Sequence, residues 1–178
     1  MVGHLGNYTY TYKPYLNREK EIIPVYLDKN FGEADKIEIG NALNQWNYVL
    51  NGNAAFKIVD KSYDINNYFA NKKQPGLFII EITSHYPLIP PSMQGSQTLA
   101  FARVGDNCLY LIRDRLDNSD ISFIVLHEVG HVLGSHHTDD GLMSPFFNKE
   151  KYQCVDLSAL PSIAKRHHWS LESLNYCR

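Results

Sequence analysis

The feature that most constrains this 178-residue chain is a short run, His127 to His137, that is rich in histidine and contains one glutamate. His127 and His131 are four residues apart, so on a helix both side chains project from one face, one turn apart. Two imidazoles at this spacing can bind one zinc ion, and Glu128 beside them can handle protons. The spacing therefore predicts a helix that carries two metal ligands and a general base.

The residues after His131 predict that the chain turns back toward the same metal. Gly134 can end the helix in a left-handed conformation that a residue with a Cβ resists. The turn then brings His137 to the ion as a third ligand. Three neutral imidazoles leave the fourth tetrahedral position open for water, which is the pattern of a catalytic rather than a structural zinc site.

The residues around the two helical histidines favour this interpretation over that of ordinary histidines on a solvated helix. A buried histidine or glutamate needs a strong partner, because removing a polar group from water is costly. The expected helix is largely apolar and hence buried. Its apolar residues are Phe123, Ile124, Val125, Leu126, Val129, Val132 and Leu133.

Together with the segment Gly141-Leu142-Met143-Ser144-Pro145, the run resembles the metzincin signature HExxHxxGxxH and its Met-turn. A proline follows two residues after the methionine, and in this the segment resembles the Met-turn of the matrixin-like branch. Astacins and serralysins have a tyrosine at the position of Pro145, so we expect no tyrosine ligand here.

This resemblance implies a role for each matching residue. His127, His131 and His137 would bind one catalytic Zn²⁺, Glu128 would be the general base, and Met143 would form the hydrophobic floor under the metal. The spacing of the signature also selects His137 over its neighbour His136, which we expect at the surface or the rim of the cleft. Calcium binding stays undetermined.

The pattern along the chain predicts an α/β (α+β) protein of one domain. We expect the N-terminal strand to lie at a sheet edge, because Pro24 lacks an N–H for pairing. Asp117, Asn118 and Ser119 are candidate N-caps of the histidine helix. The expected strands are 22–27, 56–59, 76–82, 98–104 and 108–113, and the expected helices besides the histidine helix are 33–50, 156–169 and 170–176.

The element order is similar to that of a metzincin catalytic domain. The resemblance implies a metzincin-like zincin fold: a twisted mixed five-stranded sheet with a backing helix, an active-site helix, the Met-turn and a C-terminal helix. Residues 21–178 would form the catalytic domain, with an upper subdomain to about 134 and a lower subdomain over 135–178. Residues 1–20 would be an N-terminal arm packed on the domain or the remnant of a prosegment.

Two segments are candidates for binding a peptide or protein substrate in an extended conformation. Edge-strand addition holds a peptide through main-chain hydrogen bonds. Matrixin-like enzymes place a Thr-Leu-Ala segment above the cleft, which implies this role for Thr98, Leu99, Ala100 and Phe101; an ordinary edge strand is the alternative. Pro145, Phe146 and Phe147, after the Met-turn, either shape the pocket beyond the scissile bond or pack in the core.

Composition narrows the partners and the location. A net charge of −2, from 17 basic and 19 acidic residues, gives no sign of nucleic-acid binding. No apolar run approaches the roughly 20 residues of a membrane span. The first residues lack the apolar core of a signal peptide. We expect a monomer that is secreted or at the cell surface after a signal outside this chain is removed; the alternative is a cytoplasmic protein.

Three cysteines allow one disulfide, and Cys154 with Cys177 is the favoured pair, leaving Cys108 as a thiol. Two other functions remain open beside a zinc endopeptidase. In a gluzincin-type hydrolase, Glu150 or Glu172 would be the third ligand. In a catalytically silent metzincin-like module, the same cleft would bind peptides or proteins without cutting them.

Overall fold

The computed structural model of the protein describes residues 9–15, 21–70, 74–146, 148 and 154–178. Within these ranges, none of the helices combines the length and the apolar character needed to cross a membrane. The strands and helices are, in chain order, β1 (Glu21–Asp28), α1 (Glu33–Leu50), β2 (Ala54–Tyr63), α2 (Ile65–Ala70), β3 (Leu77–Ile82), α3 (Pro91–Gln94), β4 (Ala100–Arg103), β5 (Cys108–Ile112), α4 (Ile121–Leu133) and α5 (Leu160–His167).

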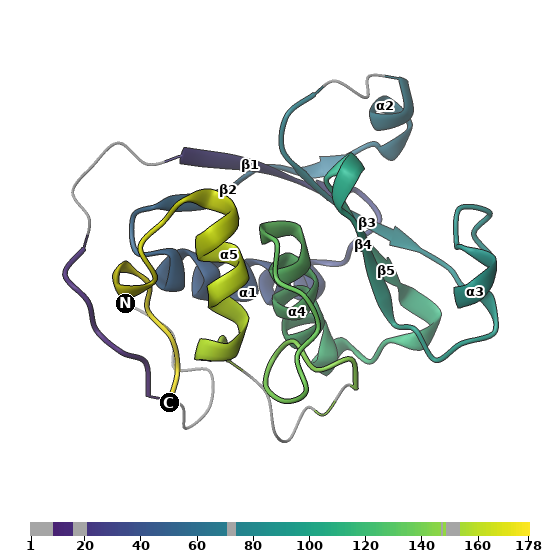
Figure 1. Ribbon diagram of the computed structural model, residues 1–178. Helices are drawn as coiled ribbons and strands as arrows, with labels where there is room; N and C mark the ends of the chain where they lie inside the picture. The colour runs from purple at the N-terminus through teal and green to yellow at the C-terminus, as the bar shows by residue number, and fades with distance from the viewer. Residues whose placement is uncertain (1–8, 16–20, 71–73, 147, 149–153) are drawn as a thin grey trace.

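The five strands form one mixed sheet in the order β2-β1-β3-β5-β4 (Figure 1). The first four strands in this order are parallel to one another, whereas β4 runs antiparallel to β5. The predicted α/β class and the mixed five-stranded sheet are confirmed. Because β4 is the last strand of the sheet, one of its edges pairs with β5 and the other is left for a different partner.

The prediction that Pro24 confines the first strand to a sheet edge is wrong, because β1 lies between β2 and β3. Pro24 pairs with Lys57 of β2, but pairing with β3 begins only at Val25. On the β3 side, the proline lies just outside the ladder. An interior strand can therefore contain this residue without losing a ladder hydrogen bond on that side.

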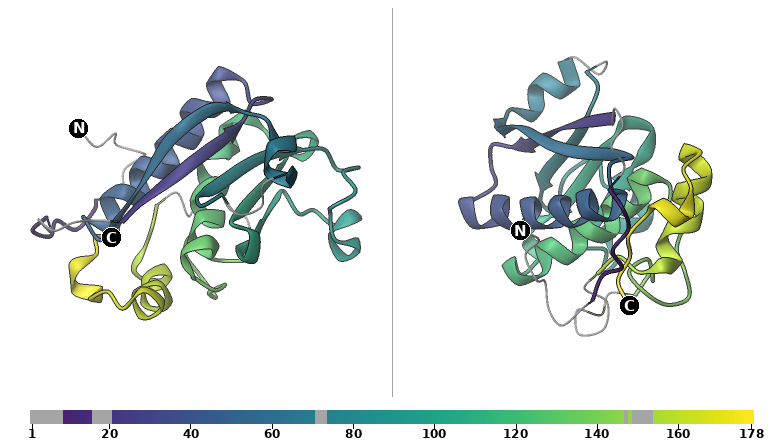
Figure 2. Two further views of the ribbon diagram at one scale, coloured as in Figure 1. Left: turned by 90° about the horizontal axis from the view of Figure 1, so that it is seen from above. Right: turned by 90° about the vertical axis from the view of Figure 1, so that its left-hand side faces the viewer.

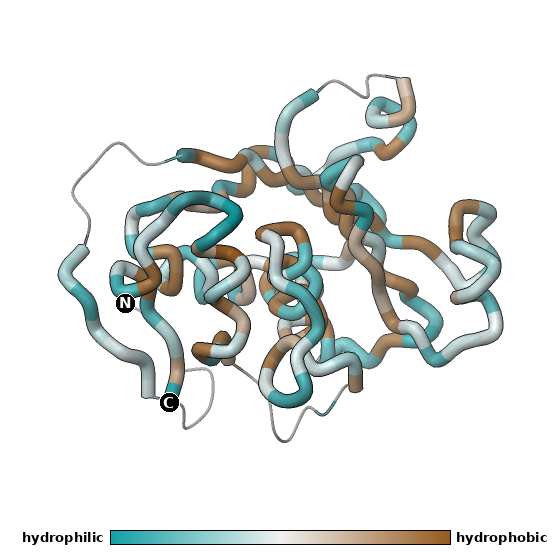
Figure 3. The backbone as a smooth tube through the Cα atoms, in the orientation of Figure 1, coloured by the Kyte–Doolittle hydropathy of each residue, from teal (hydrophilic) through white to brown (hydrophobic). Residues whose placement is uncertain are grey.

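Helices cover both faces of the sheet (Figures 1 and 2). The larger core packs α1 and α4 against one face, and the indole N–H of Trp46 in α1 donates to the carbonyl of Leu126 in α4 at 2.9 Å. The smaller core lies on the other face, under α2 and the segment that contains α3. The hydropathy colours of Figure 3 show apolar stretches along the sheet and α4. Helix α4 therefore packs both against α1 and against the sheet.

Several element boundaries differ from those predicted. Helix α1 has the predicted bounds and ends at Asn51, which adopts a left-handed conformation with φ 48°. Strand β2 is longer than predicted, and α2 and α3 were not predicted. The N-cap of α4 is Asp120 rather than an earlier residue, because a 3₁₀ turn (Asn118–Asp120) leads directly into the helix. The predicted terminal helices are α5 and a 3₁₀ turn (Leu171–Ser173).

The described part of the N-terminal arm lies beside the C-terminal segment (Figure 1). The backbone N–H of Thr11 donates to the carbonyl of Tyr176 at 2.8 Å. The favoured disulfide between Cys154 and Cys177 is confirmed, and Cys108 is a buried thiol. Residues 9–15 therefore pack on the domain, and none of them lines the cleft described below. Residues 1–8 and 16–20 of the predicted arm lie outside the described residues.

Candidate metal centre

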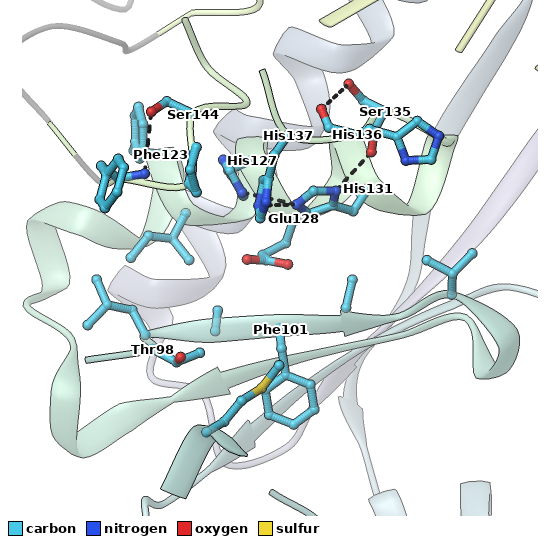
Figure 4. Close-up of a pocket in the computed structure, with 18 of the residues that line it drawn as sticks. Thr98, Phe101, Phe123, His127, Glu128, His131, Ser135, His136, His137 and Ser144 are labelled. Atoms are coloured by element: carbon cyan, nitrogen blue, oxygen red, sulfur yellow. Dashed lines mark hydrogen bonds between the residues drawn. The ribbon is translucent and has the colours of Figure 1, made fainter. Parts of the chain in front are cut away.

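Three histidines converge between α4 and the chain that follows it (Figure 4). His127 and His131 project from one face of α4, as their spacing predicts. The Nε2 atom of His131 lies 3.1 Å from Nε2 of His127 and 3.1 Å from Nε2 of His137. His127, His131 and His137 are the one group of three such side chains close enough to share a metal within the ranges that the structure describes.

The turn that brings His137 to the other two histidines begins at Gly134, as predicted. Gly134 has φ 110°, in the left-handed region, and its N–H donates to the carbonyls of Gly130 and His131. The N–H of Ser135 donates to the carbonyl of Gly130 at 2.8 Å, which completes the cap of the helix. The chain can then leave the helix axis sharply enough for His137 to return to the face of α4.

Backbone carbonyls fix the orientation of the two helical imidazoles. Nδ1 of His127 lies 2.7 Å from the carbonyl oxygen of Leu142, and Nδ1 of His131 lies 2.8 Å from that of Ser135. A carbonyl oxygen only accepts hydrogen bonds, so in each ring Nδ1 carries the proton and donates it. Both neutral rings therefore present the lone pair of Nε2 to the point where the three histidines meet.

These lone pairs suit a cation. Burial lowers the pKa of His127 to about 4 and also lowers the pKa of His131, so both rings are neutral at pH 7. Two Nε2 lone pairs that face each other cannot form a hydrogen bond. Nitrogen ligands about 2.0–2.1 Å from one tetrahedral zinc ion lie about 3.3 Å from each other. The two separations of 3.1 Å therefore fit nitrogen ligands that share one ion.

Met143 lies directly beneath this face of α4. Its side chain is fully buried, and its sulfur is 2.5 Å from the position that a Cβ on Gly130 would occupy. Any larger residue at position 130 would displace the methionine. The N–H of Thr138 donates to the carbonyl of Met143 at 3.0 Å, which ties the turn to the segment after His137. Met143 thus lies where a floor under the metal is expected, packed against the helix between the two histidines.

Asp156 holds the segment around Met143 from behind. Its Oδ2 atom accepts a hydrogen bond from the N–H of Leu142 at 2.7 Å, and its Oδ1 atom accepts one from the N–H of Ser158. The carbonyl of Leu142 is the acceptor for Nδ1 of His127. A continuous chain of hydrogen bonds therefore runs from Asp156 through Leu142 to His127. Nothing in the sequence pattern indicated this contact.

Glu128 points from α4 toward β4 rather than toward solvent (Figure 4). The residue is 8% exposed, and this burial raises the pKa of its carboxyl to about 7, whereas a hydrogen bond from the backbone of Ala102 acts to lower the pKa. A carboxyl group with a pKa near 7 can both accept and release a proton at neutral pH. Glu128 thus lies next to the three histidines but outside their cluster.

A cleft of about 1220 Å³ passes over the histidines, between β4 and the chain after Met143. It contains Glu128, the three histidines and His136, which is exposed at its rim as expected. The ring of Phe101 stacks on Tyr110 and points away from the histidines (Figure 4). Six of the seven candidate substrate-binding residues line the cleft, and their role stays a prediction: Thr98, Leu99, Ala100, Phe101, Pro145 and Phe146.

The unpaired edge of β4 faces this cleft. The carbonyl of Leu99 accepts a hydrogen bond from the N–H of Ile112, which directs the backbone of Leu99 toward β5. Because backbone groups alternate along a strand, Ala100 and Ala102 direct theirs toward the cleft. The hydrogen bond from Ala102 to Glu128 agrees with this direction. The cleft edge of β4 thus offers main-chain groups to an extended peptide at Ala100.

Two basic residues that line the cleft were not predicted. Arg115 donates to the carbonyls of Met93, Gln94 and Thr98, and so holds the chain before β4. Arg166, on α5, lies against Gly134 at the C-terminal end of α4. No sequence motif marks either residue, because each reaches the cleft from a distant element.

Glu172, one of the two alternative third ligands, is not in the histidine cluster. Glu172 lies in the exposed 3₁₀ turn near the C-terminus and does not line the cleft. Glu150 and Phe147 lie outside the described residues. The gluzincin alternative requires a glutamate as the third ligand. In the described part of the chain, the side chain that lies beside the other two histidines is that of His137.

The sequence matches no protein-family model and no curated protein. The resemblance to the metzincin signature therefore depends on the residues from His127 to Pro145 alone.

Proposed function

We propose that this protein is a zinc-dependent endopeptidase with a metzincin-like catalytic domain. The observation that carries the proposal is the pair of 3.1 Å separations among the Nε2 atoms of His127, His131 and His137. The Nδ1 atoms of His127 and His131 are engaged by backbone carbonyls, so their Nε2 atoms can only act as acceptors or ligands. Three imidazoles and one open position are typical of catalytic zinc.

The arrangement around the site supports the metzincin-like zincin fold in particular. Strand β4 lies along one side of the cleft, α4 carries two histidines, and the buried Met143 packs under them. A single glycine-capped turn separates the second histidine from the third. The region up to about 134 and residues 135–178 would then be the upper and lower subdomains of one catalytic unit.

The residues of the chain can carry out peptide hydrolysis as follows. When bound, a zinc ion lowers the pKa of a water molecule to about 7 and polarises a carbonyl group. Glu128 accepts the proton that the water loses as its oxygen attacks the scissile carbonyl carbon. Glu128 then returns that proton to the amine that leaves when the C–N bond breaks. The hydrogen bond from the backbone of Ala102 holds the Glu128 carboxylate in place for both transfers.

The cleft edge of β4 would hold the substrate in an extended conformation. Main-chain groups of Ala100 can pair with a peptide as an added strand, which positions its carbonyl over the histidines without dependence on sequence. Pro145 and Phe146 line the opposite wall and contribute apolar surface for a substrate side chain. The substrate would be an unfolded protein segment or a peptide.

The disulfide between Cys154 and Cys177 supports a secreted or cell-surface location, because disulfides persist in oxidising compartments. We further propose that the protein acts there as a monomer.

A matched pair of assays tests the catalytic proposal. The zinc-loaded protein should cut an unfolded protein such as casein, and a chelator should abolish the cleavage until zinc is restored. Glu128→Gln should retain zinc but lose activity by about 10²- to 10⁴-fold, because the general base is removed. Zinc content is measured on both proteins. A zinc-loaded wild type that binds peptides but never cuts them would make the protein a peptide-binding module instead.

A second pair of variants tests the metal ligands. His137→Ala should bind zinc at least tenfold more weakly than the wild type, because one of three protein ligands is lost. His136→Ala should bind zinc as the wild type does, since His136 is at the rim of the cleft. Zinc affinity is measured by competition with a chromogenic chelator. Equal affinities for the His137→Ala variant and the wild type would contradict the proposed ligand set.

A further inference from the structure

The two ends of the cleft differ in chemistry. On one side of the histidines, Figure 4 shows Phe123 and Ser144, and on the other it shows Ser135 and His136. The cleft lining also includes the apolar residues Leu99, Ile124 and Pro145, which are next in sequence to Thr98, Phe123 and Ser144. The second end, at the C-terminus of α4, is polar and includes Arg166 from α5. A peptide lying along β4 would extend into both ends.

Arg166 is the cation of the second end. Its side chain is exposed, and its aliphatic part lies against Gly134, where the absence of a Cβ lets it cross the end of α4. The packed stem limits where the guanidinium can lie. Among the residues that the structure describes, no carboxylate forms an ion pair with it. The guanidinium is therefore available to a ligand in the cleft.

The end of α4 does not need Arg166 as a cap. The N–H groups of Gly134 and Ser135 satisfy the carbonyl of Gly130, and Nε2 of His167 lies 2.8 Å from the carbonyl oxygen of Leu133. Together with the hydrogen bond from Gly134 to the carbonyl of His131, these contacts engage three of the last four carbonyls of the helix without Arg166.

The charge of the cleft favours an anionic ligand at this end. Glu128 is the one acidic side chain among the described residues that line the cleft, and it is buried against β4. Arg115, the other arginine, is engaged by three carbonyls near the opposite end. A guanidinium offers a fork of donors that matches a carboxylate.

We propose that Arg166 binds an acidic side chain of the substrate, so that the peptide carries Asp or Glu on one side of the scissile bond. The apolar end then takes an apolar side chain on the other side. The inference rests on the proposed endopeptidase function and specifies its substrate class. An exposed charge pair of this kind gives about a fivefold preference for Glu over Gln.

Peptides that differ only by Glu or Gln test this inference. A neutral ten-residue peptide with one cleavage site is made with Glu or Gln at each position in turn. The wild type should show about a fivefold higher kcat/KM for Glu at one position, and the preference should shrink as salt rises. Arg166→Gln should lose the preference, and Arg166→Glu should favour Lys at that position. Lys165→Glu, on the same helix but outside the cleft lining, should keep the wild-type preference.

Binding of the same peptides to zinc-loaded Glu128→Gln, measured by fluorescence anisotropy, provides a second readout. The Glu peptide should bind more tightly, and adding Arg166→Gln should remove the difference. Equal treatment of Glu and Gln in both assays, or a preference that survives Arg166→Gln, overturns the inference and leaves the endopeptidase intact. A wild type that binds the Glu peptide selectively through Arg166 but cuts no peptide overturns the proposed function. It leaves intact the inference that Arg166 binds an acidic side chain.

Discussion

The metal site lies between two regions that hold their shapes in different ways. The upper region, residues 21–134, packs α1 and α4 on a sheet, and many of its apolar side chains are completely buried. The lower region covers residues 135–178, and its described part has one short helix. Directional contacts hold its turns: Asp156 with Leu142, Thr138 with Met143, and a disulfide. Two of the three histidines come from the upper region and one from the lower.

Because of this difference, we expect substitutions in the upper region to affect the stability of the fold and substitutions in the lower region to affect the geometry of the metal ligands. A side chain removed from the upper core loses many weak contacts at once, so the expected cost is in the free energy of unfolding. A contact removed from the lower region frees one turn whose position sets a ligand. The three variants that follow probe this contrast, from the largest expected free-energy change to the smallest.

The largest effect is expected in the upper core. Leu109 is fully buried in β5, and Leu109→Ala should lower the free energy of unfolding by about 4 kcal/mol. The folded fraction should bind zinc as the wild type does. Urea unfolding of the zinc-free protein measures the first quantity and chelator competition the second. Ile37→Ala, at a site 62% exposed on α1, is the matched control and should change stability by less than about 0.5 kcal/mol. A large fall in the zinc affinity of folded Leu109→Ala would contradict the expected difference between the two regions.

The disulfide should have the next largest effect. Cys154 and Cys177 are separated by 23 positions, and closing a loop of that length stabilises the folded state by about 3 kcal/mol in the chain-entropy model. The Cys154→Ser, Cys177→Ser double variant should lose this amount in urea unfolding. Dithiothreitol should reduce the stability of the wild type to a similar extent and leave the double variant unchanged. An effect of the reductant on both proteins would mean that another group responds to it.

Asp156 should have a smaller effect, and mainly on the metal. Asp156→Ala removes the acceptor for the N–H of Leu142, whose carbonyl orients His127. Loss of such a supporting contact typically weakens metal affinity by about 10- to 100-fold. Asp156→Asn keeps an acceptor oxygen and should lose less. Asp139→Ala, at an exposed acidic position near His137, is the control, and its zinc affinity should equal that of the wild type. Equal losses in the Asp139→Ala and Asp156→Ala variants would show that local charge matters rather than the hydrogen bond.

The sequence predicts best what depends on neighbours along the chain. The spacing of His127 and His131, the glycine at 134 and the bounds of α1 are local patterns, and each appears in the structure as predicted. The hairpin of β4 and β5 is also local. The strand that contains Pro24 was wrongly predicted to lie at an edge. The strand order of a parallel sheet is set by long connections, and the sequence of a single strand does not indicate it.

The parts of the site that were not predicted come from distant elements. Asp156 reaches Leu142 across 14 positions, and Arg166 reaches Gly134 from α5. Neither residue belongs to a periodic pattern or a motif, because a carboxylate or guanidinium at those positions is also compatible with an ordinary exposed residue. Only the folded chain shows that Asp156 has a hydrogen-bond partner in the turn and that Arg166 has no ion-pair partner within the described ranges.

The contact between Gly130 and Met143 has a consequence for how the chain can vary. The two unspecified positions inside HExxH are not equivalent here: Val129 is a core residue, whereas position 130 has no room for a methyl group while methionine occupies position 143. In a library randomised at both 130 and 143, active clones should show compensation, with alanine at 130 accompanied by a shorter residue at 143. The sizes of residue 130 in the helix and residue 143 in the turn should therefore vary together.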